Sequence, residues 1–391
     1  MREKLRRLIG NLALLSFSLL FFYVVFGSLL LRYGPPFFLT IDHVFPLEAN
    51  LWWQHSAPDP DKNDYIALLG DSLAKGIGDW RAQRTQLDEP YHSADVIHAI
   101  TGKNILSFGH GGIGSADGFV LMPALALSAD RCLIFPKPRK PTEVIYYFYE
   151  GNDLNNNLGF IAKALRLDRN SADVQSAAKR LFESWRKPGF LSCSTYFFKV
   201  IEAFVQIALP IAKRRGALSR LDPKVINHLL VNDTEVTAPG RLQGPALELS
   251  DHDTELAFEV FDASLEWFQR ANPDIKVMIV DIPSVLTNYH FARPTVTIQT
   301  YQRGNMEQEA ARIPARSDAI CRRLFASAER HGTLFVDARP DMREAASRAV
   351  IHGPLDWSHP NKIGYTRLGE TVAAALLGDT SHSTCASLAE N

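Results

Sequence analysis

The chain has 391 residues, of which 46% are hydrophobic and 22% charged, so it contains enough apolar material for a sizeable core. Its net charge of -1 gives no general basic field, which argues against a nucleic-acid-binding protein. The cysteines are Cys132, Cys193, Cys321 and Cys385, and none share CxxC spacing, which argues against a zinc ribbon or a thioredoxin-like motif. We expect separate thiols or, in an oxidising compartment, one disulfide whose partners stay open.

The N-terminus has the pattern of a membrane anchor. Basic residues cluster in 1–7, whereas residues 8–31 carry no charge. A helix over this run would be about 36 Å long, enough for a bilayer core of about 30 Å. The basic flank comes first, so we expect a single-pass anchor over 1–33 with a cytoplasmic N-terminus and a periplasmic or other extracytoplasmic domain. A cleaved signal peptide is the alternative, although no A-x-A-like site follows the run.

The rest of the chain alternates between strand and helix patterns. A proline-rich linker is expected at 34–62, and the folded domain at 63–378. The expected strands are 65–69, 104–108, 143–149, 276–282 and 333–336, and the expected helices are 90–101, 115–129, 251–271, 314–331 and 361–377. This alternation predicts an α/β fold, a three-layer α/β/α sandwich with a mostly parallel five-stranded sheet.

Three segments depart from this alternation. We interpret residues 155–250 as an inserted helical subdomain or lid, and residues 284–312 as a second, smaller insertion. The tail at 379–391 is polar, and we expect it to be disordered.

Two motifs follow the first two expected strands, at the sheet edge where parallel sheets place their ligand sites. In Gly70-Asp71-Ser72-Leu73, a glycine turn can expose the Ser72 hydroxyl at the start of a helix, although taken alone Ser72 could be a helix N-cap. The glycine cluster at 109–114 lets the backbone approach a ligand and offers N–H groups to an oxyanion. Its spacing is not that of a dinucleotide-binding loop.

Two further motifs complete the set. Asn152 follows the third strand and can donate a side-chain N–H to a developing negative charge. Asp356 and His359 lie three residues apart before the last helix, where the carboxylate can hold one imidazole nitrogen while the other faces the serine. A nucleophile, a base and oxyanion donors at one sheet edge are the requirements of acyl transfer. The Ser, Asp, His order matches α/β-hydrolases, but the second glycine of GxSxG is absent.

These motifs resemble the four blocks of the SGNH (GDSL) hydrolases. The match places Ser72 in GDSL, Gly112 in SFGHGGIG, Asn152 in YYFYEGND and His359 in DWSHPN, with Asp356 as the third member of a triad. It covers about residues 64–378 apart from the insertions. The resemblance implies a flavodoxin-like sheet and an oxyanion hole formed by Ser72, Gly112 and Asn152. Ser107 departs from the Asn or Asp common in the second block, and Gly109 and Gly111 compete with Gly112.

The resemblance implies a membrane-anchored bacterial serine esterase that cleaves carboxylic esters, O-acyl or O-acetyl esters among them. The expected substrate is a small acyl ester or an acylated cell-surface glycan or lipid, with no metal and no organic cofactor. An O-acyltransferase acting on bacterial polysaccharide is the first alternative. A metal-dependent phosphoesterase and a catalytically silent binding or scaffolding module are the others. The acyl group and the oligomeric state stay open.

Overall fold

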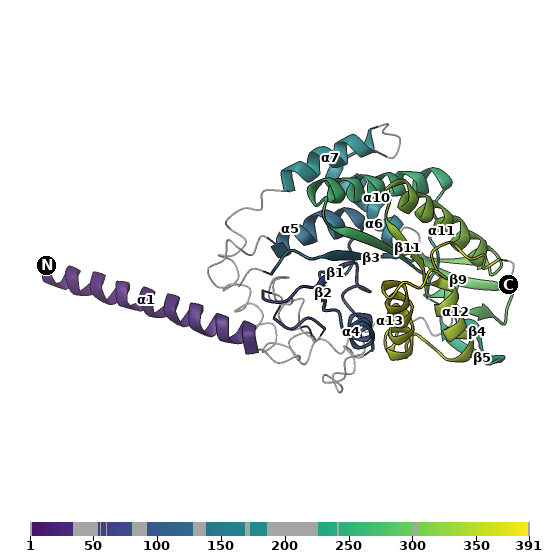
Figure 1. Cartoon of the computed structure of the whole chain (residues 1–391), viewed down its shortest axis with the longest axis horizontal. Coiled ribbons are helices and arrows are strands. Elements are labelled where there is room, and N and C mark those ends of the chain that lie inside the picture. Colours follow the sequence, from purple (N-terminus) through teal and green to yellow (C-terminus); the bar gives the residue numbers. More distant parts are fainter. Residues whose placement is uncertain are drawn as a thin grey trace.

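The computed structural model describes residues 2–33, 54, 56–59, 61–79, 92–127, 138–168, 173–185, 226–240, 242–300 and 304–389. Most of the expected linker lies outside these ranges, as do Cys132 and Cys193. Within the described part, the elements of the folded domain surround one central sheet (Figure 1).

Five parallel strands form the central sheet. They are β1 (Ile66–Gly70), β2 (Ile105–Ser107), β3 (Glu143–Tyr149), β7 (Lys276–Ile282) and β11 (Leu334–Asp337). Their order is β11-β7-β3-β1-β2, and every neighbouring pair is parallel. In chain order this is the 2-1-3-4-5 arrangement of flavodoxin-like sheets, whose order reverses between β1 and β3. The five expected strands and the parallel sheet are confirmed.

Both faces of the sheet are buried because successive side chains of a strand point to opposite sides. In β1, Ala67 and Leu69 join one apolar cluster, whereas Ile66 and Leu68 join the other. Figure 1 shows α6, α10 and α11 on one side of the sheet and α4, α12 and α13 on the other. The α/β/α layering therefore follows from continuous apolar strands that need cover on both faces.

The helices of the two layers agree closely with the sequence-based expectation. Those expected are α4 (Ser93–Thr101), a π-helical turn (Asp117–Leu121) that leads into α5 (Met122–Leu127), α10 (Asp251–Ala271), α11 (Arg312–Arg330) and α13 (Lys362–Leu376). The short helix α12 (Arg339–Arg348) was not anticipated, and α6 (Asp153–Phe160) begins two residues before the expected helical insertion. Side-chain N-caps start α10 and α13: Ser250 accepts from Asp253 N, and Asn361 from Ile363 N and Gly364 N.

The expectation of a helical insertion at 155–250 is correct only for its first part. The described helical elements there are the end of α6, a π-helical turn (Ile161–Leu165) and α7 (Val174–Trp185). Further along, the chain forms β4 (Ile226–Val231), β5 (Thr234–Pro239) and β6 (Leu242–Gln243). Purely helical structure is thus wrong for the second part, where β4 and β5 form a hairpin. Strands β4 and β6 also pair with strands further along the chain.

The second insertion supplies those partners. It contains a 3-10 turn (Leu286–Asn288), β8 (His290–Phe291), β9 (Thr295–Thr300) and β10 (Gly304–Glu309). Strands β5, β4 and β8 form one small sheet, and β10, β9 and β6 form another. The two insertions therefore fold together beside the central sheet.

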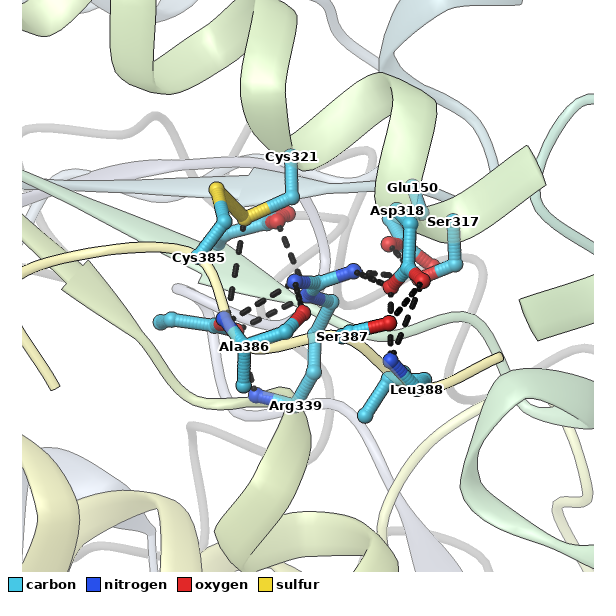
Figure 2. Close-up of a disulfide and its surroundings, with 11 residues drawn as sticks. Glu150, Ser317, Asp318, Cys321, Arg339, Cys385, Ala386, Ser387 and Leu388 are labelled. Atoms are coloured by element: carbon cyan, nitrogen blue, oxygen red, sulfur yellow. Dashed lines mark hydrogen bonds and ion pairs between the residues drawn. A yellow bond between two sulfur atoms is a disulfide. The ribbon is translucent and has the colours of Figure 1, made fainter. Parts of the chain in front are cut away.

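The C-terminal tail is ordered over residues 379–389, which corrects the expectation of disorder for this part. Cys321 on α11 and Cys385 in the tail form a disulfide (Figure 2). The Asp318 carboxylate accepts hydrogen bonds from the backbone N–H of Leu388 through both oxygens, at 3.0 Å each. Leu388 is itself buried, at 4% exposure. The tail thus packs on the domain through covalent, polar and apolar contacts that its polar composition does not reveal.

Residues before β1 also take part in the structure. Helix α1 spans Arg2–Tyr33, and its apolar side chains between Leu8 and Phe22 are exposed. Within the described part of the chain, no helix meets the length and apolarity needed to cross a membrane.

Gln54, in the expected linker, pairs with the backbone of Ser107 at the end of edge strand β2, donating to its carbonyl and accepting from its N–H. The folded domain therefore includes residues before the expected boundary.

Candidate active site

The end of β1 carries the proposed nucleophile. Gly70 has φ +137°, and a Cβ there would lie 2.8 Å from the Tyr147 carbonyl oxygen of the neighbouring strand, so only glycine fits this turn. The residues that follow form hydrogen-bonded turns rather than the expected helix start, with Ile77 N donating to Ser72 O at 3.0 Å. Ser72 is 6% exposed. The turn thus holds its hydroxyl at the carboxyl end of β1.

Three side chains form a hydrogen-bonded chain. Ser72 Oγ lies 2.8 Å from His359 Nε2, and His359 Nδ1 lies 2.7 Å from Asp356 Oδ2. With a carboxylate as its partner, Nδ1 carries the proton, which leaves Nε2 to accept from the serine hydroxyl. Ser72 Oγ therefore makes its contact with the imidazole, as the triad arrangement requires, and does not act as a helix cap. The structure brings these three predicted residues together.

The Asp356 carboxylate is held in its charged form. Burial raises its pKa, but hydrogen bonds from His359 and from the Ser358 N–H, together with the charge on His359, outweigh burial and leave the pKa below its ordinary value. The Ser358 N–H donates to Asp356 Oδ1 at 3.0 Å. One carboxylate oxygen is therefore fixed by the loop backbone while the other holds the imidazole. This division of roles orients the ring of His359.

Asn152, after β3, lies next to the nucleophile turn. Its Nδ2 donates to Asp71 Oδ2 at 2.7 Å. The same carboxylate oxygen lies 3.3 Å from Ser72 Oγ, and it competes for the single hydroxyl hydrogen with His359 Nε2, which is closer at 2.8 Å. Burial raises the pKa of Asp71, against hydrogen bonds from Leu73 N, Asn152 and Ser72 and the charge of His359. Since an amide nitrogen carries two hydrogens, one Asn152 N–H binds Asp71 and the other can serve a second acceptor.

The structure separates the glycines of the second loop by role. A Cβ on Gly109 would lie 2.4 Å from Lys75 N, so this glycine is required for packing against the nucleophile turn. A Cβ on Gly111 would lie 3.9 Å from Ser72 Cβ, whereas one on Gly112 (φ +75°) would meet nothing within 4 Å. By this measure Gly111 is closer to Ser72 than Gly112, the predicted donor. The oxyanion role of Gly112 stays a prediction.

Ser107, the departure from the family pattern, has a structural role in the same loop. Its hydroxyl donates to the Ala74 carbonyl at 2.5 Å and accepts from Gly109 N at 3.1 Å. A hydroxyl can do both, so Ser107 ties the glycine loop to the nucleophile turn.

A cavity of about 510 Å³ borders the glycine loop. Its lining includes Gly112, Asp117, Asn155 and Asn156, with Trp185 of α7 on the insertion side. The lining combines amides, a carboxyl group and an aromatic ring, so it offers both polar and apolar contacts. The first insertion thus contributes a wall to the cavity beside the predicted oxyanion loop.

Metal-binding geometry is found at a single place among the described residues. Ligand atoms of Cys321, Asp337 and Cys385 lie within 4.8 Å of one another. Both sulfur atoms belong to the disulfide, so neither is a thiolate that can bind a metal.

Asp79 and His352 lie near the loop that holds Asp356, and neither was anticipated from the sequence. Asp79 Oδ1 accepts from the backbone N–H of Leu355 and Asp356. Behind the loop, buried His352 contacts the Tyr289 hydroxyl through Nδ1 at 3.1 Å. Nothing in the local pattern distinguishes Asp79 from an ordinary turn residue, because its partners lie 276 and 277 residues further along the chain.

The fold and the site define an α/β/α domain whose central parallel sheet carries a Ser-His-Asp arrangement at one edge. No protein-family model matches the chain, and no curated protein does. Among solved structures, the chain is similar to an extracellular lipase from Streptomyces rimosus, with a TM-score of 0.38 and 17% identity. That comparison covers 80% of this chain and 99% of the lipase. At this level of similarity, the functional argument rests on the site itself.

Proposed function

We propose that this protein is a serine esterase of the SGNH type, with Ser72 as nucleophile, His359 as general base and Asp356 as the residue that orients the base. The observation that carries the proposal is the hydrogen-bonded chain from Ser72 Oγ through His359 to Asp356, at 2.8 and 2.7 Å. Nucleophile and base within hydrogen-bond reach, with the base oriented by a third group, are the signature of an activated serine.

The mechanism follows from this geometry. Ser72 Oγ attacks the ester carbonyl while its proton passes to His359 Nε2, and Asp356 stabilises the imidazolium that forms. The imidazolium then protonates the leaving alcohol. Water, deprotonated by the same imidazole, attacks the acyl-enzyme and releases the carboxylic acid. The imidazolium returns its proton to Ser72 Oγ as the acyl group leaves, so these side chains and water account for every proton transfer.

The developing oxyanion requires hydrogen-bond donors beside Ser72. The proposed donors are the backbone N–H groups of Ser72 and Gly112 and the second amide hydrogen of Asn152. The hydrogen bond from Asn152 to Asp71 supports this role, because it fixes the amide next to the nucleophile turn. The closeness of Gly111 to Ser72 makes its N–H a competing donor.

The substrate class proposed is a carboxylic ester, such as a small acyl ester or an acylated glycan or lipid. The cavity next to Gly112, of about 510 Å³, lies within the usual range of small-molecule sites, and it adjoins the proposed oxyanion loop while Ser72 and His359 lie outside its lining. An O-acyltransferase would use the same acyl-enzyme but pass the acyl group to a sugar hydroxyl. Product analysis with and without a polysaccharide acceptor distinguishes the two reactions.

A fluorophosphonate probe tests the nucleophile directly, with mapping of the labelled residue by mass spectrometry. We expect labelling at Ser72, and loss of both labelling and p-nitrophenyl acetate hydrolysis in Ser72→Ala, by roughly 10³- to 10⁶-fold in rate. Ser347→Ala is the matched control, because the Ser347 hydroxyl is exposed and bonds only a neighbouring carbonyl in the described structure. An unchanged rate in Ser72→Ala would refute the proposal.

We also propose that the N-terminal segment 1–33 anchors the protein in a membrane, with the catalytic domain outside the cytoplasm. The uncharged run after a basic start supports this, and so does the Cys321–Cys385 disulfide, because such bonds persist in oxidising compartments. The test compares the full chain with one lacking residues 1–33. We expect only the full chain to stay with membranes after alkaline carbonate washing.

A further inference from the structure

Asp79 connects the nucleophile turn to the loop of the catalytic acid. It lies seven residues after Ser72, and it is 6% exposed. One carboxylate oxygen, Oδ1, accepts from two consecutive backbone N–H groups, of Leu355 at 3.1 Å and of Asp356 at 2.5 Å. The segment that begins with the nucleophile therefore holds the backbone of the residue that orients the base.

These contacts hold the backbone N–H groups of Leu355 and Asp356, which the Asp356 side chain does not contact. Both oxygens of the Asp356 carboxylate are engaged, one by Ser358 N and the other by His359. Their direction depends on where the Asp356 backbone lies. Asp79 holds the N–H of this residue, while Gly353 N donates to its carbonyl at 3.1 Å. Hydrogen bonds from N–H groups to a carboxylate are about twice as strong as neutral ones, so they suit this purpose.

The charged form of Asp79 is unfavourable at this position, because the residue is buried and lies near the charge of Asp356. Burial raises the pKa of Asp79, and the charge on Asp356 raises it further, whereas the two N–H groups lower it. Two carboxyl groups therefore lie close together, and the backbone N–H groups of the catalytic loop offset part of the cost. If the N–H groups of Leu355 and Asp356 moved away, the charged form of Asp79 would lose this compensation.

We propose that Asp79 is a positioning residue for catalysis, which keeps Asp356 in line with His359 by holding the backbone N–H groups of Leu355 and Asp356. This inference rests on the proposed esterase function. Asp79 touches neither Ser72 nor His359 in the described contacts, so it acts through Asp356.

Steady-state hydrolysis of p-nitrophenyl acetate by the full chain tests the proposal. Asp79→Ala removes the acceptor, and we expect kcat to fall about 10- to 100-fold while KM stays within about twofold. Asp79→Asn keeps a carbonyl oxygen that can accept both N–H groups, so its kcat should stay within about threefold of wild type. Asp64→Ala is the matched control, since the Asp64 side chain is 73% exposed and forms a surface ion pair.

A double-mutant cycle tests the route of the effect. If Asp79 acts through Asp356, then Asp79→Ala should cost little further kcat in an Asp356→Asn protein, because the two losses overlap. Additive losses would overturn the proposal, as would wild-type kcat in Asp79→Ala or equal losses in Asp79→Ala and Asp79→Asn. Should Asp79→Ala fail to fold, Asp79→Ser replaces it, since its hydroxyl is too short to reach both N–H groups.

Wild type and Ser72→Ala are measured in parallel, so that the two hypotheses fail separately. A wild-type protein that neither hydrolyses the ester nor takes up the fluorophosphonate refutes the proposed function. An active wild type with an unaffected, folded Asp79→Ala variant refutes the positioning role alone.

Discussion

Ser72 and His359 are 287 residues apart in the chain, yet Ser72 Oγ lies 2.8 Å from His359 Nε2. The contact joins the turn after β1 to the loop before α13. Helices α13 and α4 lie on the same face of the sheet, and Gly369 of α13 packs against Val96 of α4. The packing of the layers thus brings the two halves of the site together.

The first prediction concerns the orientation of the imidazole. In Asp356→Asn the side-chain amide can donate to Nδ1, which favours the wrong His359 tautomer, so kcat should fall by roughly 10³- to 10⁴-fold with little change in the fold. Ester hydrolysis and thermal unfolding measure the two effects. A folded Asp356→Asn protein with wild-type kcat would remove Asp356 from the mechanism.

The second prediction concerns the amide of Asn152. Replacement by alanine removes one oxyanion donor, and we expect kcat to fall about 10²- to 10³-fold, equivalent to about 3–4 kcal/mol, with KM nearly unchanged. Asn63→Ala provides the control, since the exposed Asn63 side chain bonds the Pro58 carbonyl at the surface, far along the chain from Asn152. A change in KM with kcat preserved would instead assign Asn152 to substrate binding.

The third prediction concerns buried Arg339. Its guanidinium is fully buried and pairs with Asp337 at 2.8 Å, Asp318 at 3.0 Å and Asp281 at 3.4 Å (Figure 2 shows Arg339 and Asp318). Arg339→Gln leaves these acids without their counter-charge, so the free energy of unfolding should drop by about 3–5 kcal/mol. Urea denaturation measures this.

The matched control for Arg339 is Arg139→Gln. Arg139 pairs with Asp64 in solvent, with a side chain 52% exposed, so its loss should cost at most about 1 kcal/mol. Equal effects of the two substitutions would contradict the argument from burial.

The fourth prediction concerns the disulfide. Cys321 and Cys385 are 64 residues apart, and closing a loop of that length restricts the unfolded chain. Replacing both with alanine should lower the free energy of unfolding by about 2–4 kcal/mol. Wild type unfolded in a reducing agent should match the double variant, and identical urea midpoints for oxidised and reduced wild type would refute the prediction.

The fifth prediction concerns pH. Burial, and then the charge of His359, lowers the pKa of His352 from 6.5 to about 3. Between these two values the unfolded chain binds one more proton than the folded one. The free energy of unfolding should therefore fall as the pH drops from about 6.5 toward about 3, by up to about 1.4 kcal/mol per pH unit from this residue.

His352→Gln tests this dependence. The slope of unfolding free energy against pH should flatten in that window, whatever the absolute stability of the variant. His110→Gln, at an exposed position, should leave the slope as in wild type. An unchanged slope in His352→Gln would show that another group dominates acid destabilisation.

The central strands were predictable from the sequence, which also singled out Ser72, Asp356 and His359, the three side chains that the structure brings within hydrogen-bond reach of one another. The run 143–149 is apolar and ends before a glycine, and β3 has these bounds. Such local patterns suffice because a strand buried on both faces needs a continuous apolar run, and because acyl transfer needs a nucleophile, a base and an acid of particular residue types.

Which side chains and strands from distant parts of the chain contact one another could be read from the tertiary structure alone. The contacts of Asp79 and Asp318, the pairing of Cys321 with Cys385, and the pairings of β4 with β8 and of β6 with β9 depend on segments far apart in the chain. Local composition predicted a disordered polar tail and a helical insertion. In the structure the tail packs through distant hydrogen bonds, and the insertion contains the β4–β5 hairpin and β6, which pairs with distant β9. A local sequence pattern does not specify which distant strand or side chain will be its partner. The free energy of those distant contacts outweighs the conformational preference of a short segment.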